Sequence, residues 1–121
     1  METYAYTINL KKDDALVEQY LEHHRAVWPE VLTSLKEVGV EQMKIFRVGY
    51  KMFMYMEAVD GFNPSVDFPR YLTLDDRCQV WEDLMGTFQE VCEEAQEDEK
   101  WALMEEAFDF KEQINNLSVK A

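Results

Sequence analysis

Cysteine, histidine and proline are rare in this sequence of 121 residues, which holds two cysteines, two histidines and three prolines. Cys78 and Cys92 form no Cys-x-x-Cys pair and the two histidines are adjacent. The ligands of a structural zinc site are therefore missing, and no metal is expected. We expect both thiols to be reduced and packed, as in a cytoplasmic protein.

Long apolar runs and targeting signals are also missing. The first ten residues, METYAYTINL, have neither the basic start nor the apolar segment of a signal peptide. No stretch approaches the length of a membrane span, so no membrane association is predicted. We therefore expect a soluble, cytoplasmic protein.

Positive charge is outnumbered by negative charge. Lys and Arg number 12 against 25 Asp and Glu, which gives a net charge of −13 and a pI near 4.4. Such a surface repels nucleic-acid phosphates, so no nucleic-acid partner is expected and a strongly anionic substrate is disfavoured. A neutral ligand such as a sugar is not repelled, although acidity more commonly serves solubility alone.

What is present is enough for one domain with one core. Apolar residues make up 47% of the chain, which is an ordinary share for a globular protein. We expect a single domain over residues 1–121, with a polar tail of uncertain order at 111–121.

The first half of the chain alternates between strand and helix patterns. Asp13 is the expected N-cap of a first helix, and Pro29 separates it from a second, because proline fits a first turn but not a helix interior. The predicted elements are a strand at 3–10, helices within 11–24 and at 29–39, and a hairpin of strands at 41–48 and 51–59.

The second half is predicted to hold a loop, a long helix and a strand. Glycine, asparagine and two prolines indicate a loop at 60–71, and helical periodicity follows at 73–95. After a solvated turn at 96–100, the last strand is expected at 101–110. The helix residues expected to face the core are Val80, Leu84, Phe88 and then either Val91 or Cys92.

The resulting order, β-α-β-β-α-β, predicts an α+β protein of ferredoxin-like topology, with an antiparallel sheet and helices on one face. Strand 51–59 places Met52, Met54 and Met56 on one face, and its other face is also largely apolar, so both faces are expected to be covered. The methionine face and the aromatic residues of the first strand indicate pairing with a second sheet, which predicts a homodimer.

One short segment, EHHRAVWPE at residues 22–30, holds both histidines. Tyr20 and His24 are four residues apart and share a helix face, and the chain break that follows allows Trp28 to turn inward beside them. Imidazole moves protons near neutrality without a metal, and aromatic rings pack against the C–H faces of sugars. Adjacent helical residues point about 100° apart, so His23 is expected to be exposed or at the helix edge. The alternative is structural, with Tyr20 and Trp28 in the core and both histidines on the surface.

The run from Tyr20 through His24 and Trp28 to Pro29 and Glu30 resembles the signature of the L-rhamnose mutarotase family. The similarity continues through the segments MFMYMEAVD, CQVWEDLM and KWALMEEAFDF. The resemblance implies a dimeric α/β barrel built from ferredoxin-like domains. It also implies interconversion of the α and β anomers of a 6-deoxy sugar, with no metal or organic cofactor.

The resemblance implies roles for individual residues as well. His24 corresponds to the catalytic proton donor, Tyr20 to a substrate-binding residue and Trp81 to a wall of the sugar site. Trp28 belongs to the same predicted sugar site through its place in the signature. In ring opening, an acid protonates the ring oxygen while a base removes the anomeric proton, so His24 is expected to act as acid on opening and as base on closing.

Two residues depart from the rhamnose-specific pattern. Met43 stands where rhamnose-specific members carry a tyrosine, and Glu82 stands where they carry a second tryptophan. Both positions are associated with the sugar site, so L-fucose competes with L-rhamnose as the expected substrate. The counterpart base is left open between Glu82 and Glu57, and each is equally well explained as a structural or solvated residue.

Two other functions share the expected fold. One is a dimeric monooxygenase of the haem-degrading type, which would also use a helix histidine. The other is a ligand-binding module without catalytic activity, which fold alone does not exclude.

Overall fold

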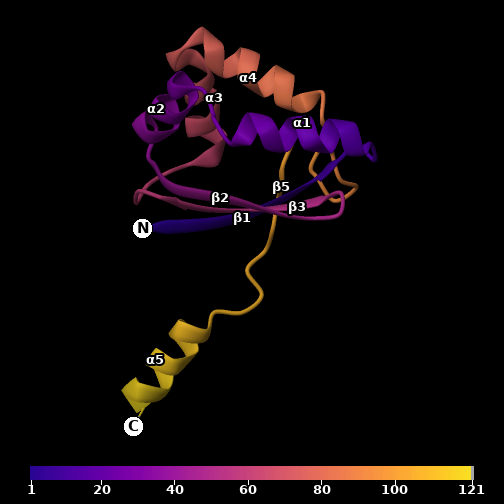
Figure 1. Ribbon diagram of the computed structural model, residues 1–121. Helices are drawn as coiled ribbons and strands as arrows, with labels where there is room; N and C mark the ends of the chain where they lie inside the picture. Colours follow the sequence, from indigo (N-terminus) through magenta and orange to yellow (C-terminus); the bar gives the residue numbers. More distant parts are fainter. Residues whose placement is uncertain (121) are drawn as a thin grey trace.

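The computed structural model describes residues 1–120, and the side chains of residues 1–117. It contains one antiparallel sheet with four helices, α1 to α4, gathered on one of its faces (Figure 1). The elements are β1 (Glu2–Leu10), α1 (Asp14–His24), α2 (Pro29–Glu37), β2 (Val40–Val48), β3 (Lys51–Ala58), α3 (Pro64–Leu74), α4 (Asp76–Gly86), β4 (Gln89–Glu90), β5 (Ala102–Leu103) and α5 (Phe110–Lys120).

The strand order is β2-β3-β1-β4, with β5 also pairing β1, and every pairing is antiparallel. Helices α1 and α2 connect β1 to β2, and helices α3 and α4 connect β3 to β4. This is the ferredoxin-like topology, so the predicted α+β fold class is confirmed. Within residues 1–120, no helix is long and apolar enough to cross a membrane.

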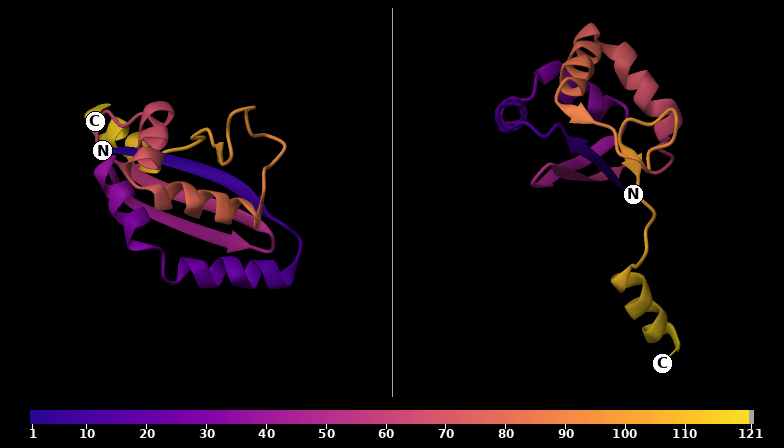
Figure 2. Two further views of the ribbon diagram at one scale, coloured as in Figure 1. Left: turned by 90° about the horizontal axis from the view of Figure 1, so that it is seen from above. Right: turned by 90° about the vertical axis from the view of Figure 1, so that its right-hand side faces the viewer.

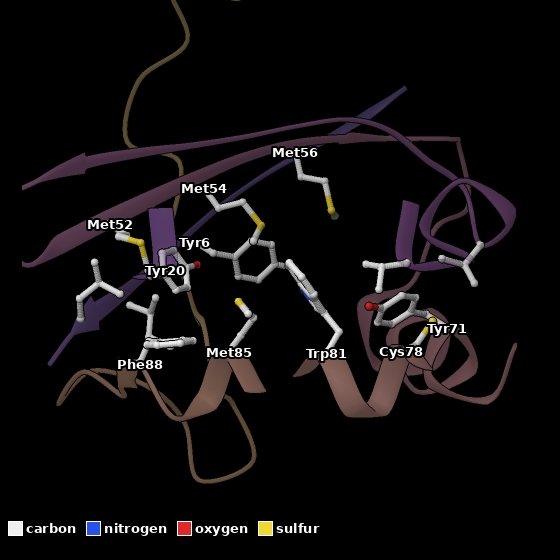
Figure 3. Packing of buried hydrophobic residues seen from close by; sticks show 14 of the residues in the cluster. Tyr6, Tyr20, Met52, Met54, Met56, Tyr71, Cys78, Trp81, Met85 and Phe88 are labelled. Atoms are coloured by element: carbon white, nitrogen blue, oxygen red, sulfur yellow. The ribbon is translucent and has the colours of Figure 1, made fainter. Parts of the chain in front are cut away.

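The methionine face of β3 lies under the helices. Met52, Met54 and Met56 are exposed by 8% or less. Figure 3 shows them on the strand opposite Trp81 and Met85, which point up from α4. The expectation that this face pairs with a second sheet is wrong, because the protein's own helices already cover it.

The opposite face of the sheet is open in the single chain. Phe46 is 56% exposed, Val48 is 75% exposed and Phe53 is 37% exposed. Phe46 and Phe53 stack across β2 and β3 with ring centroids 6.1 Å apart. The described chain therefore covers β3 on one face only, whereas covering on both faces was expected.

The predicted break between the first two helices is confirmed. Asp13 caps α1 by accepting hydrogen bonds from the backbone N–H groups of Ala15 and Leu16. Helix α1 ends at His24, and Pro29 opens α2, where its missing N–H costs nothing because first-turn donors have no helical partner.

The loop predicted at 60–71 is wrong, because most of it belongs to α3. Asn63 caps this helix by accepting from Ser65 N, and Pro64 occupies the first turn. Pro69 lies inside the helix, and a proline at such a position is more typical of a loop. Tyr71 is 2% exposed and anchors α3 in the core, so tertiary packing outweighs the local cost of the proline.

The single helix predicted at 73–95 is also wrong. Asp75 is extended, with φ −156°, and its side chain caps α4, which ends at Gly86. Val80, expected in the core, is 53% exposed. Helix α4 instead buries Cys78, Trp81 and Met85.

The C-terminal part departs furthest from expectation. The strand predicted at 101–110 shrinks to β5, and the predicted tail contains α5, which stands away from the sheet (Figures 1 and 2). Ala121, the end of that tail, lies outside the described residues. Both cysteines are free thiols, but Cys92 lies in the β4–β5 loop rather than in a helix.

Candidate active site

The last turns of α1 carry the residues at the centre of the predicted site. Tyr20 is buried, with 2% exposure, and His24 one turn further on is half-buried. Their ring centroids are 4.2 Å apart, with the planes inclined by 31°. The i, i+4 spacing therefore brings a phenol and an imidazole together, as the sequence predicts.

The backbone sets the tautomer of His24. Nδ1 of the ring lies 2.9 Å from the carbonyl oxygen of Tyr20. A carbonyl oxygen only accepts hydrogen bonds, so Nδ1 carries a proton and donates it. Nε2 is therefore the nitrogen available to take or give a proton.

The surroundings of His24 favour its neutral form. Burial lowers the pKa of the imidazole below its usual value of 6.5. The hydrogen bond to the Tyr20 carbonyl partly opposes this lowering, and the neighbouring His23 adds to it. A neutral imidazole with a free Nε2 suits proton exchange near neutrality.

Trp81 on α4 joins the two halves of the site. Its ring centroid lies 5.5 Å from that of His24 and 5.1 Å from that of Trp28, and both contacts are edge-on. Trp28 is the last residue before α2 and is half-buried, whereas Trp81 is 5% exposed. The structure thus brings together Tyr20, His24, Trp28 and Trp81, which we call the aromatic site.

Arg77 makes a cation–π contact with Trp28. Its guanidinium carbon lies 4.1 Å from the centroid of the Trp28 ring. Its Nε is 3.4 Å from Oε2 of Glu30, so a carboxylate from α2 orients the guanidinium. These contacts link α2 to α4 and fix the indole at the edge of the aromatic site.

The hydroxyl of Tyr20 is held by a buried amide. Nε2 of Gln89 donates to it over 3.4 Å. Burial raises the pKa of Tyr20 to about 12, although the hydrogen bond from Gln89 lowers it in part. The phenol therefore stays protonated at neutral pH, and it can form hydrogen bonds but does not release its proton.

Glu82, the residue after Trp81, is half-buried on α4. Burial raises the pKa of its carboxyl above 4.5, and Lys100 opposes that effect. The Lys100 ammonium also donates to the backbone carbonyl of Glu82 over 2.9 Å. Burial is the main cause of the raised pKa values of Tyr20 and Tyr71, and the negative charge of Glu82 adds to both.

Two other predicted residues lie on the sheet. Met43 pairs with Met56 across β2 and β3, so it lies on the helix-covered face and packs against the core. Glu57 lies on the open face of the sheet, where it accepts a hydrogen bond from Tyr55. Of the two carboxylates considered as the counterpart base, Glu82 is therefore on the helix that carries Trp81, and Glu57 is on the opposite face of the sheet.

Sequence reasoning missed two residues beside the site. His23, expected to be exposed or at the edge, is half-buried, and its ring centroid lies 5.6 Å from that of Phe88 and 6.3 Å from that of Trp81. Gln89 was placed inside a helix, although α4 ends at Gly86 and Gln89 begins a strand. No local signal marks these contacts, because both depend on where α4 stops.

Open hollows lie elsewhere on the surface. One of about 430 Å³ lies beside α2 and α3 and is lined by acidic groups, including Glu30, Glu37 and Asp75. Another of about 260 Å³ lies on the open face of the sheet, between Phe46 and Phe53. Neither hollow includes a residue of the aromatic site, whose half-buried edge is formed by His24 and Trp28.

One acidic trio has the spacing of a cation site. Carboxylate oxygens of Glu106, Asp109 and Glu112 lie within 4.8 Å of one another at the start of α5. Glu106 and Glu112 are exposed, and the trio includes neither histidine. Exposed acidic groups of this kind are common without an ion.

The fold and the site together define a class of protein. A ferredoxin-like sheet carries a histidine with a free Nε2 among several aromatic faces, an arrangement that is able to exchange protons with a neutral ligand. The chain belongs to the L-rhamnose mutarotase family, whose model matches residues 3–110. It is therefore an isomerase that interconverts sugar anomers.

Three known proteins are similar to this chain. An L-fucose mutarotase of Xanthomonas campestris is 37% identical over 103 residues, covering 84% of this chain and 82% of the relative. A UPF0734 protein of Dictyostelium discoideum is 36% identical over 118 residues, covering 93% and 94%. The crystal structure of an L-rhamnose mutarotase from Formosa agariphila matches with a TM-score of 0.64 at 22% identity, covering 91% and 99%, which supports the fold.

Proposed function

We propose that the whole chain, residues 1–121, is one mutarotase domain acting on a 6-deoxyhexose, with His24 as its central acid–base group. The observation that carries this proposal is the 2.9 Å contact between His24 Nδ1 and the Tyr20 carbonyl. It leaves Nε2 free at a half-buried edge beside aromatic rings. The sugar is proposed to enter at this edge, with its C–H surface against Trp28 and Trp81.

The proposed reaction needs one mobile proton on a pair of groups. In the form in which His24 holds this proton and Glu82 is ionised, His24 gives its Nε2 proton to the ring oxygen, while the Glu82 carboxylate takes the anomeric hydroxyl proton and the bond from C1 to the ring oxygen breaks. The open-chain aldehyde turns about the C1–C2 bond. The ring hydroxyl then returns its proton to His24, Glu82 protonates the aldehyde oxygen, and the other anomer forms.

Glu82 suits the counterpart role for a physical reason. Burial raises the pKa of its carboxyl, and burial lowers the pKa of His24, so the affinities of the two groups for a proton approach one another. Two groups with similar pKa values exchange protons in either direction. Mutarotation needs this, because the two anomers differ little in free energy and the reaction runs both ways. No metal or organic cofactor has a part in this scheme.

L-Fucose is the substrate that we propose first, with L-rhamnose as the competitor. Met43 and Glu82 depart from the rhamnose-specific pattern, and the 37% identical relative is an L-fucose mutarotase. Glu82 offers a carboxylate for sugar hydroxyls, and Met43 offers an adaptable apolar surface. Tyr20 is proposed to bind the sugar through its protonated hydroxyl.

We also propose that two copies pair through the open face of the sheet. Phe46, Val48 and Phe53 form an exposed apolar group there. Face-to-face packing of two sheets would cover it and complete a dimeric α/β barrel. The free thiols favour a reducing compartment, and a cytoplasmic location is proposed on that basis.

The decisive test is anomer exchange measured by saturation-transfer NMR, with L-fucose and L-rhamnose side by side. His24→Asn should slow enzymatic exchange roughly 10²–10⁴-fold, because it removes the acid–base group. The fold should be retained, since asparagine can still donate to the Tyr20 carbonyl, and sugar binding should persist.

His23→Asn is the matched control, since it makes the same change one residue away. It should lose far less activity, because His23 has no assigned part in the proton transfers. Unchanged exchange in His24→Asn would contradict the proposed site. The absence of acceleration of both sugars by the wild type would contradict the proposed substrates.

A further inference from the structure

Gln89 is one of two polar residues that the described chain buries, the other being Ser34. It is 8% exposed and lies in β4, where it pairs with Leu10 of β1. Its amide reaches the hydroxyl end of Tyr20, to which Nε2 donates over 3.4 Å. Tyr20 in turn stacks on His24, so the Gln89 amide is one side chain away from the proposed acid–base group.

The other end of this amide has no partner. Oε1 of Gln89 is buried and accepts no hydrogen bond from any described residue. The Tyr20 hydroxyl accepts from Gln89, and its own hydrogen is given to no acceptor among residues 1–117. Exchanging the amide oxygen and nitrogen only moves the unpaired group, because the amide then has an unused donor in place of an unused acceptor.

An unpaired buried acceptor destabilises a fold, so its presence beside an active site points to a ligand group that satisfies it. Here one acceptor and one donor lie next to each other. A sugar hydroxyl both donates and accepts, so one hydroxyl, or two neighbouring ones, matches the pair. An anionic group does not match it, because a lone amide oxygen repels negative charge.

We propose that Gln89 is a direct sugar contact. Its Oε1 accepts a hydrogen bond from a ring hydroxyl, and the Tyr20 O–H donates to the same or the adjacent hydroxyl. This inference rests on the proposed function and extends the sugar site beyond α1, α2 and α4 to β4. L-Fucose and L-rhamnose differ in configuration at C2 and C4. We assign the contact to one of these two hydroxyls, which makes Gln89 a specificity-determining residue.

The test replaces Gln89 by methionine, which keeps the length of the side chain and removes its hydrogen bonds. Dissociation constants and exchange rates are measured by NMR for both sugars. Gln89→Met should weaken binding of the preferred sugar about tenfold, and should weaken the other sugar less. Gln79→Met is the matched control, since Gln79 is exposed on α4 and bonds only Asp83 among described residues.

A second comparison separates direct contact from an effect through Tyr20. If Gln89 only positions the phenol, Gln89→Met should have no further effect in a Tyr20→Phe background. If it contacts the sugar, the loss should persist there. Two outcomes would overturn the proposal but not the proposed function, provided that the wild type still exchanges anomers. One is that a folded Gln89→Met binds the sugars as tightly as the wild type, and the other is that Gln89→Met has no effect in the Tyr20→Phe background. A wild type that neither binds nor exchanges either sugar would overturn the proposed function, and this contact with it.

Discussion

At the scale of single residues, the side chains of His24 and Glu82 determine the proposed chemistry of this protein. A single backbone contact assigns the proton of His24 to Nδ1, and the half-buried carboxyl of Glu82, the residue after Trp81, is the group proposed to share a proton with it. The remaining aromatic residues supply faces and a low-polarity environment. In the proposed pairing, small changes in the pKa of either group change the rate.

The pH profile of exchange follows from these two groups. The active form carries one proton on the pair, so activity falls when both groups are protonated and when neither is. Burial lowers the pKa of His24 below 6.5 and raises the pKa of Glu82 above 4.5. The acidic limit of activity therefore moves to higher pH and the alkaline limit moves to lower pH. The optimum is expected on the acidic side of neutrality.

The measurement is kcat/KM from pH 4 to 9, after subtraction of exchange in buffer alone. Glu82→Gln should remove the dependence that belongs to the carboxyl and should lower the rate at the optimum by roughly 10²-fold or more. An optimum above pH 8, or a wild-type profile without any optimum, would contradict the pairing of His24 with Glu82.

At the scale of elements, the junctions between helices and strands position the site. The break between α1 and α2 lets Trp28 contact Trp81, which also contacts His24, and the end of α4 at Gly86 turns Gln89 into the sheet. The turn after α2 is equally constrained, because Gly39 has φ 111° and leads directly into β2. Few side chains tolerate that backbone conformation.

Gly39→Ala tests this constraint. A Cβ at this position would lie 2.7 Å from Cγ2 of Val59, in addition to the strain of the positive φ. We expect a loss of about 2 kcal/mol or more in the free energy of unfolding, measured in urea. Gly49→Ala is the control, with φ 59° and no atom within 4 Å of the added Cβ. Gly49→Ala should lower the free energy of unfolding by only about 1 kcal/mol. A larger loss in Gly49→Ala than in Gly39→Ala would show that the Gly39 turn is not close-packed.

At the scale of the whole molecule, one face of the sheet is covered by helices and the other is open. The exposed face carries Phe46 and Phe53 stacked on one another, while the net charge of the chain is −13. In a two-fold symmetric pair, each residue at the interface appears twice. A carboxylate placed there would therefore enter the interface twice, within an already acidic assembly.

Phe46→Glu tests the proposed pairing. Wild-type protein is expected to sediment as a dimer, and Phe46→Glu should shift it to monomer at micromolar concentration. Val80→Glu is the matched control, because Val80 is 53% exposed on α4 and Phe46 is 56% exposed on the sheet. A monomeric wild type, or dissociation caused equally by both changes, would contradict pairing through the open face.

The sequence by itself determined what depends on neighbours along the chain. Alternation predicted the long strands, Asp13 and Pro29 predicted the limits of α1 and α2, and the four-residue spacing placed Tyr20 against His24. These features follow from backbone geometry within one or two turns. The order of elements then allowed few topologies, so the ferredoxin-like fold was predictable as well.

Only the tertiary structure decided which surfaces meet. Helix α3 forms despite Pro69 because Tyr71 is buried, and α4 turns Trp81 rather than Val80 inward because the sheet and α1 lie on that side. The contacts of His23 and Gln89 depend on where α4 ends and β4 joins the sheet. Such contacts join residues far apart in sequence, and burial against a distant partner outweighs local preference because packing supplies most of the stability of a helix in a folded protein.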